Sequence, residues 1–181
     1  RMLRNKVFSV MLVAALVLAG AFSATSTRAQ TDPAPLVLQD FEGEVEFAES
    51  YQAEASVGDV AQTGKGSLKS ASETGEWHAV SFKVAGAPVD ISGFDQFCFG
   101  VNDTTEAKNT VGVRLYDSAG AKTERWTDNE GVGANPKTKK DTWTAMCLNL
   151  ISFTGLDLTK IEKVEFTMFA AGVYYFDDVV A

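Results

Sequence analysis

Apolar and polar residues alternate along most of the chain after residue 35, in short runs separated by polar or glycine-containing turns. The clearest run is 110–117, in which three aliphatic residues fall on one face while Arg114 and Tyr116 fall on the other. A period of two is typical of a strand with one buried face. The segment 122–127 follows after a short turn and is predicted to return as the hairpin partner of this strand.

The same reasoning predicts about nine or ten short strands. The expected ranges are 36–41, a strand after the glycine turn 62–66, then 76–84, 97–101, 110–117, 122–127, 143–151, 161–169 and 173–180. The acidic stretch 42–47 also alternates, and a bulge at Gly43 would turn Val45 and Phe47 inward. The segment 51–60 shows no clear pattern. Since no helical period follows the first 29 residues, the chain is predicted to be all-β, a sandwich or barrel.

The N-terminal segment has a different character. Three basic residues precede an apolar run from Val7 to Phe22, and small residues lead to Ala29. This layout is that of an export signal, so residues 1–29 are predicted to be a cleaved signal helix. A retained membrane anchor is the alternative. Residues 30–35 would be a linker and 36–181 one folded domain, exported to the cell surface, the periplasm or the extracellular space.

Charge narrows the choice of partners. The 181 residues include 16 basic and 24 acidic ones, for a net charge of −8. Four of the basic residues lie in 1–29, which leaves 12 basic against 24 acidic residues in the remainder. Such an acidic domain is not expected to bind nucleic acid, whose phosphates attract basic surfaces.

The reactive side chains argue against catalysis. The chain has one histidine, His78, on the apolar face of 76–84, where a packed histidine is expected. A zinc site needs more His and Cys ligands than this chain has, and Ser-His-Asp catalysis would depend on His78 alone, without a nucleophile-elbow motif. Cys98 and Cys147 lie in two expected strands, and the sequence leaves open a disulfide or two buried thiols. We therefore predict that the protein is not an enzyme.

The acidic pair Asp177-Asp178 lies inside the last expected strand. Carboxylates there are unfavourable unless they reach water, a cation or hydrogen-bond donors. We predict that the first and last strands lie side by side and share a cation. In the alternative, the pair lies at the sheet edge in water. The acidic residues near the first strand that could contribute are Asp40, Glu42, Glu44 and Glu46.

Five short motifs occur in order along the chain. They are Asp-Phe-Glu at 40–42, Gly-Lys-Gly-Ser-Leu-Lys at 64–69, Val-Asp-Ile-Ser-Gly-Phe-Asp at 89–95, Trp-Thr at 143–144 and Tyr-Tyr-Phe-Asp-Asp-Val at 174–179. Together they resemble the galactose-binding-like jelly rolls, especially the carbohydrate-binding modules of enzymes that degrade plant polysaccharides. The complex I intermediate-associated protein family is similar in the same places.

This resemblance implies a jelly-roll β-sandwich of two antiparallel sheets. It also implies a structural Ca²⁺ that joins the terminal strands. Asp40 or Glu42, Asp177 and the carbonyl of Lys65 would be its ligands. Hard cations prefer such oxygen donors.

A carbohydrate site combines aromatic platforms with polar groups that orient hydroxyls. We expect it on the face formed by Arg114, Tyr116 and Trp126, with Trp77 as a second aromatic. In the alternative, Arg114 pairs with Glu124 and the aromatics only cover sheet edges. Trp143 is expected in the core.

The sequence thus predicts an exported, non-catalytic protein that binds an oligo- or polysaccharide. The alternative is a structural subunit of an extracytoplasmic or membrane-associated assembly that uses the same face against a protein partner.

Overall fold

The computed structural model describes residues 34–106, 108–128 and 135–181. The chain divides into two units, Arg1–Asp32 and Pro33–Ala181, and only the second contains described residues. The expected signal or anchor at 1–29 therefore lies outside them. Within the described ranges, no helix has the length and hydropathy needed to cross a membrane.

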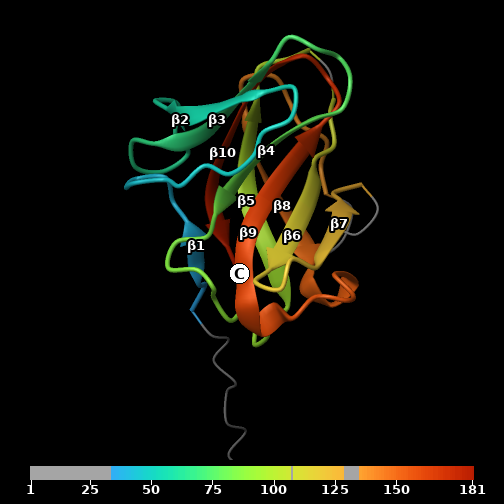
Figure 1. Cartoon of the computed structure of the whole chain (residues 1–181). Helices are drawn as coiled ribbons and strands as arrows, with labels where there is room; N and C mark the ends of the chain where they lie inside the picture. The colour runs from blue at the N-terminus through green and yellow to red at the C-terminus, as the bar shows by residue number, and fades with distance from the viewer. Residues whose placement is uncertain (1–33, 107, 129–134) are drawn as a thin grey trace, which may run out of the picture. The chain divides into compact units, whose positions relative to one another are not determined.

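The described residues form an all-β sandwich of two antiparallel sheets, which confirms the predicted fold class (Figure 1). The larger sheet has the order β2-β3-β10-β5-β8, with β1 also paired to β10. Its strands are β1 (Val37–Gln39), β2 (Glu54–Gly58), β3 (Ser67–Ser72), β10 (Gly172–Val180), β5 (Gln96–Asp103) and β8 (Trp143–Asn149). The smaller sheet has the order β4-β9-β6-β7. Its strands are β4 (His78–Lys83), β9 (Ile161–Met168), β6 (Gly112–Asp117) and β7 (Lys122–Trp126). Two 3₁₀ turns, Leu150–Ser152 and Leu158–Lys160, connect β8 to β9.

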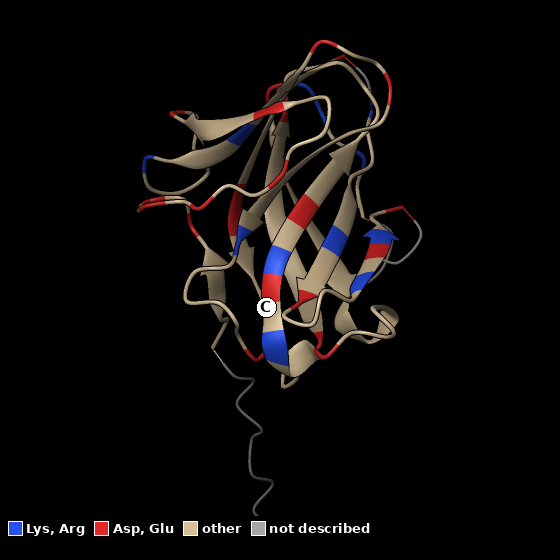
Figure 2. Ribbon diagram, in the orientation of Figure 1, with Lys and Arg blue, Asp and Glu red and all other residues tan. Residues whose placement is uncertain are grey.

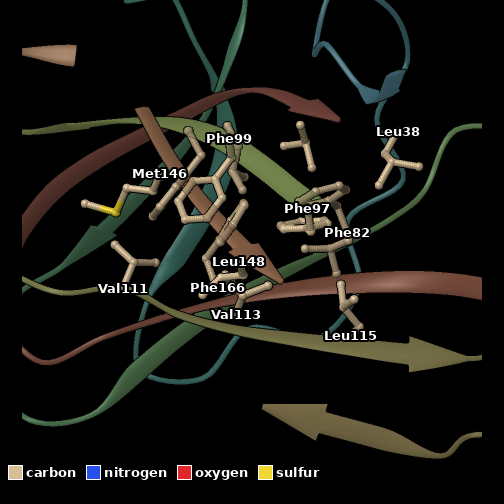
Figure 3. Close-up of a cluster of buried hydrophobic side chains, with 14 of the residues drawn as sticks. Leu38, Phe82, Phe97, Phe99, Val111, Val113, Leu115, Met146, Leu148 and Phe166 are labelled. Carbon is tan, nitrogen blue, oxygen red and sulfur yellow. The ribbon is translucent and has the colours of Figure 1, made fainter. Parts of the chain in front are cut away.

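The core lies between the sheets and is rich in phenylalanine (Figure 3). Phe166 of β9 stacks on Phe176 of β10 with ring centroids 4.1 Å apart, so this pair joins the two sheets. Phe99 of β5 lies 4.8 Å from Phe166. Since the inner side chains of every strand are used here, the outer face of each sheet is left for other contacts.

The two chain ends of the domain pair as predicted. Val37 pairs with Val180, and Leu36 and Ala181 exchange backbone hydrogen bonds of 2.9 Å. β10 contains an irregularity between Asp177 and Val180, where Asp178 has a φ of 51°. The acidic pair therefore lies at a bulge, which is where β10 changes partner from β3 to β1.

A disulfide joins Cys98 of β5 to Cys147 of β8, which settles the alternative that the sequence left open. The two cysteines are direct cross-strand partners. Both lie on the outer face of the larger sheet and are half-buried.

The segment 51–60, which the sequence left unassigned, contains β2, an edge strand. In 42–47 the chain turns at Phe41 with a φ of 56° and then follows the edge of β4, and Val45 and Phe47 pack against the core as expected. One detail of the sequence interpretation was wrong. Trp143 is not in the core, since the buried residues of β8 alternate with it, and its ring lies on the outer face against Gly100.

His78 is packed as predicted. Its side chain is fully buried, and Nδ1 lies 3.1 Å from the carbonyl oxygen of Glu76. Its other ring nitrogen, Nε2, has no hydrogen-bond partner among the described residues.

Candidate functional site

The structure brings together the four side chains expected to bind a ligand. Arg114 and Tyr116 alternate with buried residues of β6 and so lie on the outer face of the smaller sheet. Trp126 ends the neighbouring β7, directly opposite Gly112. Trp77 immediately precedes β4, and the guanidinium carbon of Arg114 lies 5.8 Å from the centroid of its ring. This outer face is called the aromatic face below.

One end of the aromatic face carries two aromatic pairs, of which Tyr51–Trp77 is tilted and Trp126–Phe169 is stacked. Tyr51 lies 4.7 Å from Trp77, and Phe169 lies 5.2 Å from Trp126 with an interplanar angle of 24°. Tyr51 and Phe169 are 51% and 54% exposed, so each pair presents open ring surface to solvent. Exposed, rigid aromatic groups of this kind are typical of binding surfaces.

Sequence reasoning missed Tyr51 and Phe169. Phe169 continues the outer-face positions of β9 after Glu165 and Thr167, and an aromatic residue on that polar face was a usable signal. Tyr51 lies in a segment without periodicity. It reaches the face because its backbone pairs with Ala79 of β4, a contact that no local pattern reveals.

Small residues beneath the rings hold them close to the sheet. Ala79, Thr167 and Gly112 occupy one row across β4, β9 and β6. A Cβ atom placed on Gly112 would lie 2.8 Å from the ring of Trp126. Glycine at this position therefore allows the indole to lie directly on the backbone of β6.

Polar groups behind the rings are fixed by one network. Arg114 forms ion pairs with both Glu165 and Glu124, so the Arg114–Glu124 pairing expected in the alternative to a carbohydrate site is present. Tyr116 donates a hydrogen bond of 2.9 Å to Glu165, and the indole nitrogen of Trp126 donates one of 2.7 Å to Glu124. Figure 2 shows basic and acidic positions interspersed on β6, β7 and β9. Because the guanidinium has five donors, the network orients it and leaves N–H groups for a ligand.

Burial in this network raises the pKa of the Tyr116 phenol, and the hydrogen bond with Arg114 partly offsets the rise. The phenol therefore stays protonated at neutral pH and keeps its hydrogen bond to Glu165. The ring itself has an ammonium group on either side. The Nζ atoms of Lys163 and Lys122 lie 3.8 and 5.8 Å from its centroid. A depression of about 700 Å³ adjoins it, lined in part by Tyr116, Lys83 and Lys163.

Two of the four residues expected to bind calcium, Glu42 and Asp177, contact the loop 62–66, which contains the third, Lys65. Glu42 Oε1 accepts hydrogen bonds of 2.6 and 2.8 Å from the backbone N–H groups of Lys65 and Gly66. Asp177 Oδ2 accepts bonds of 2.8 and 3.1 Å from the N–H groups of Gln62 and Thr63.

The pKa values of the two acids shift in opposite directions. The amides of Gly66 and Lys65 lower the pKa of Glu42. Burial raises the pKa of Asp177, although the amide of Thr63 opposes the rise. The remaining acid, Asp40, accepts a bond of 3.2 Å from the N–H of Glu42.

This arrangement does not fit the expected calcium site. Calcium takes six to eight oxygen ligands, whereas here the carboxylates face amide donors, and Lys65 contributes its N–H. Among the described residues, no three His, Cys, Asp or Glu side chains gather as a metal site would require. The loop joins the two terminal strands through amides. The calcium site stays a prediction from the sequence, and these amide contacts argue against it.

No protein-family model matches the sequence, and no curated protein matches it. Solved structures do match. A family 30 carbohydrate-binding module aligns with a TM-score of 0.60 and 16% identity, over 80% of this chain and 86% of the module. A family 11 module of a Clostridium thermocellum cellulosomal cellulase aligns with a TM-score of 0.57 and 16% identity, over 81% and 93%. The chain has the fold of these carbohydrate-binding modules.

A third module with this fold is the CBM22-1 xylan-binding domain of Paenibacillus barcinonensis Xyn10C, with a TM-score of 0.51 and 14% identity, over 81% of this chain and 94% of that one. The likeness to carbohydrate-binding modules that the motifs suggested is thus confirmed for the fold. The second family that the motifs resemble stays a prediction.

Proposed function

We propose that this protein is a non-catalytic module that binds carbohydrate on the aromatic face. The observation that carries the proposal is the two aromatic pairs, Tyr51–Trp77 and Trp126–Phe169, beside the fixed guanidinium of Arg114. Sugar rings present apolar C–H faces and polar hydroxyl edges. Aromatic rings can accept the former, and charged hydrogen-bonding groups the latter.

The fold adds support of a weaker kind. One structure of a family 11 module is a complex with a β-1,3-1,4-mixed-linked tetrasaccharide, and the family 22 module is named as xylan-binding. Since fold alone does not determine function, these ligands serve only as first probes for this chain.

A catalytic role for the face is not favoured. Glycosidases use two carboxylates, one to donate a proton and one as nucleophile or base. Both carboxylates of the aromatic face, Glu124 and Glu165, are held in ion pairs by Arg114. Two carboxylates bound to one guanidinium are not free to act separately as proton donor and nucleophile.

The proposal also includes export. The Cys98–Cys147 disulfide supports it, because structural disulfides persist in oxidising compartments. Sequencing the N-terminus of the protein isolated from its host would test the cleavage after Ala29. A retained segment 1–29 would favour the anchored alternative.

The binding test uses isothermal titration with mixed-linked β-glucan and xylan. Trp77→Ala and Trp126→Ala should each weaken binding by about tenfold, since a well-placed aromatic anchor contributes more than about 1 kcal/mol. Trp143→Ala is the matched control, because Trp143 lies on the outer face of the other sheet. Equal losses in all three variants would refute the proposed site. Failure to bind any glycan, with a fixed protein partner on purification, would favour the assembly subunit instead.

A further inference from the structure

A row of basic residues crosses the aromatic face at the end away from the aromatic pairs Tyr51–Trp77 and Trp126–Phe169. Lys83 of β4 pairs with Lys163 of β9, Lys163 with Tyr116 of β6, and Tyr116 with Lys122 of β7. Side chains at paired positions point to the same side of a sheet. Three lysines and one tyrosine therefore form a row on a single face of a chain whose net charge is −8.

Within the described part of the chain, two of these lysines are not neutralised. Lys83 forms an ion pair of 2.5 Å with Glu46. Among the described residues, neither Lys163 nor Lys122 has a carboxylate within ion-pair distance, and both ammonium groups lie within 6 Å of the centre of the Tyr116 ring. Unpaired cations gathered at one point are unfavourable to each other, and an added anion would relieve this repulsion.

The acidic groups nearby leave room for such an anion. Glu165 is held by Arg114 and Tyr116, and Asp117 is bonded to the backbone N–H groups of Ala119 and Ala121. Glu49 and Glu162 also line the adjoining depression, and Glu162 contributes to the electrostatic environment of Lys83. Among the described residues, neither of these two carboxylates forms an ion pair with Lys163 or Lys122.

One ligand could contact both the lysine row and the two aromatic pairs. Tyr116 lies four positions after Gly112 along β6, and Gly112 lies beneath Trp126. That separation is about 13 Å along a strand. A glycan that stacks on the aromatic end and extends along the strands would therefore pass Arg114 and reach Lys163 and Lys122.

We propose that the glycan bound on the aromatic face is acidic, with a carboxylate or sulfate placed between Lys163 and Lys122 beside Tyr116. This inference rests on the proposed function and narrows its ligand class. An ammonium group binds either anion through charge-assisted hydrogen bonds. Because the lysines are partly exposed, the contribution should be modest and should weaken with added salt.

The test compares ligands that differ only in charge. One pair is an oligogalacturonate and its methyl ester, and the other is a cello-oligosaccharide before and after sulfation. At low salt the charged member of at least one pair should bind about three- to tenfold more tightly, the range expected of two exposed ion pairs. The preference should shrink as sodium chloride is raised. The pair that shows it identifies the anion as carboxylate or sulfate.

Two variants complete the test. Lys122→Met with Lys163→Met should abolish the preference for the charged ligand and leave the affinity for its neutral partner unchanged. Lys69→Met is the matched control, because Lys69 lies on the outer face of the other sheet and has no ion pair within the described ranges. An unchanged melting temperature would show that the variants fold.

The outcomes distinguish a failure of the acidic-glycan inference from a failure of the proposed carbohydrate binding. If neutral and charged ligands bind equally, and only Trp77→Ala and Trp126→Ala weaken binding, the acidic ligand is refuted while the carbohydrate site stands. If the lysine variants lose affinity for neutral ligands as well, the lysines do not act on an anion. If no glycan of either pair binds and none of the glycans tested before does, the proposed function itself fails.

Discussion

The Cys98–Cys147 disulfide allows a quantitative prediction of its contribution to the free energy of unfolding. Its two cysteines are 49 residues apart in sequence, so the bond restricts a long segment of the unfolded chain. In the chain-entropy account, a loop of this length corresponds to about 4 kcal/mol of stability at 25 °C. Both side chains lie on the outer face of the larger sheet, so removing them opens no cavity in the core.

The perturbation is the double variant Cys98→Ser and Cys147→Ser, compared with the oxidised and the reduced wild-type protein. The free energy of unfolding, from urea titration, should fall by about 4 kcal/mol, and the melting temperature by about 10 °C. The double variant and the reduced wild type should agree. The seven cross-strand pairs between β5 and β8 should keep the fold intact in both.

A loss below about 1 kcal/mol would contradict this reasoning. It would mean either that the unfolded chain already holds β5 and β8 close together, or that the bond does not form in the protein. Counting free thiols in the unfolded wild type with a thiol reagent distinguishes these two cases.

Three further predictions follow from single contacts. Burial lowers the pKa of His78, and its bond to the Glu76 carbonyl only partly opposes this. The unfolded chain therefore binds more protons than the folded one, so the free energy of unfolding should be full above about pH 6.5 and fall as the pH drops below that value. When urea unfolding is compared at pH 5 and 7, this fall should be smaller in His78→Gln. An equal slope in both proteins would contradict this account. Gly112→Ala should displace Trp126 and weaken glycan binding in titration, with a loss of stability of about 1–3 kcal/mol, whereas unchanged affinity would contradict the described packing. Since amides occupy Glu42 and Asp177, neither EDTA nor added calcium should change the melting temperature, and a rise with calcium would restore the metal site.

Strand positions were predictable where apolar and polar residues alternate in the sequence. β6 and β8 alternate between buried and more exposed residues, and their predicted ranges were close to those observed. β2 lies at a sheet edge with no fully buried residue, so its sequence carries no period. The stretch 42–47 does alternate, but there the pattern reflects side chains packed along the edge of β4.

The site was predictable in part. Arg114, Tyr116 and Trp126 came from the polar face of one hairpin, where strand register is local. Their partners Tyr51 and Phe169 depend on pairing between distant segments, which a single sequence does not encode in any local pattern.

The acidic residues at the domain ends show a different limit. That they meet the loop 62–66 followed from the pairing of the first and last strands. Whether a carboxylate there meets a cation or an amide depends on which way the peptide groups of the loop point. Gly64, with a φ of 63°, and Gly66 let this loop approach Glu42 and the Phe41 carbonyl closely. Residue types alone do not reveal such peptide orientations.

The central claim concerns which face meets the glycan, and the three tryptophans of the chain report on it separately. Trp77 and Trp126 lie on the aromatic face, and Trp143 lies on the outer face of the other sheet. The most direct measurement follows the three indole N–H signals by NMR during a glycan titration, with each assigned from its Trp→Phe variant. The account predicts that the signals of Trp77 and Trp126 move with one binding constant while that of Trp143 stays in place. Movement of Trp143 alone, or of all three signals equally, would contradict it.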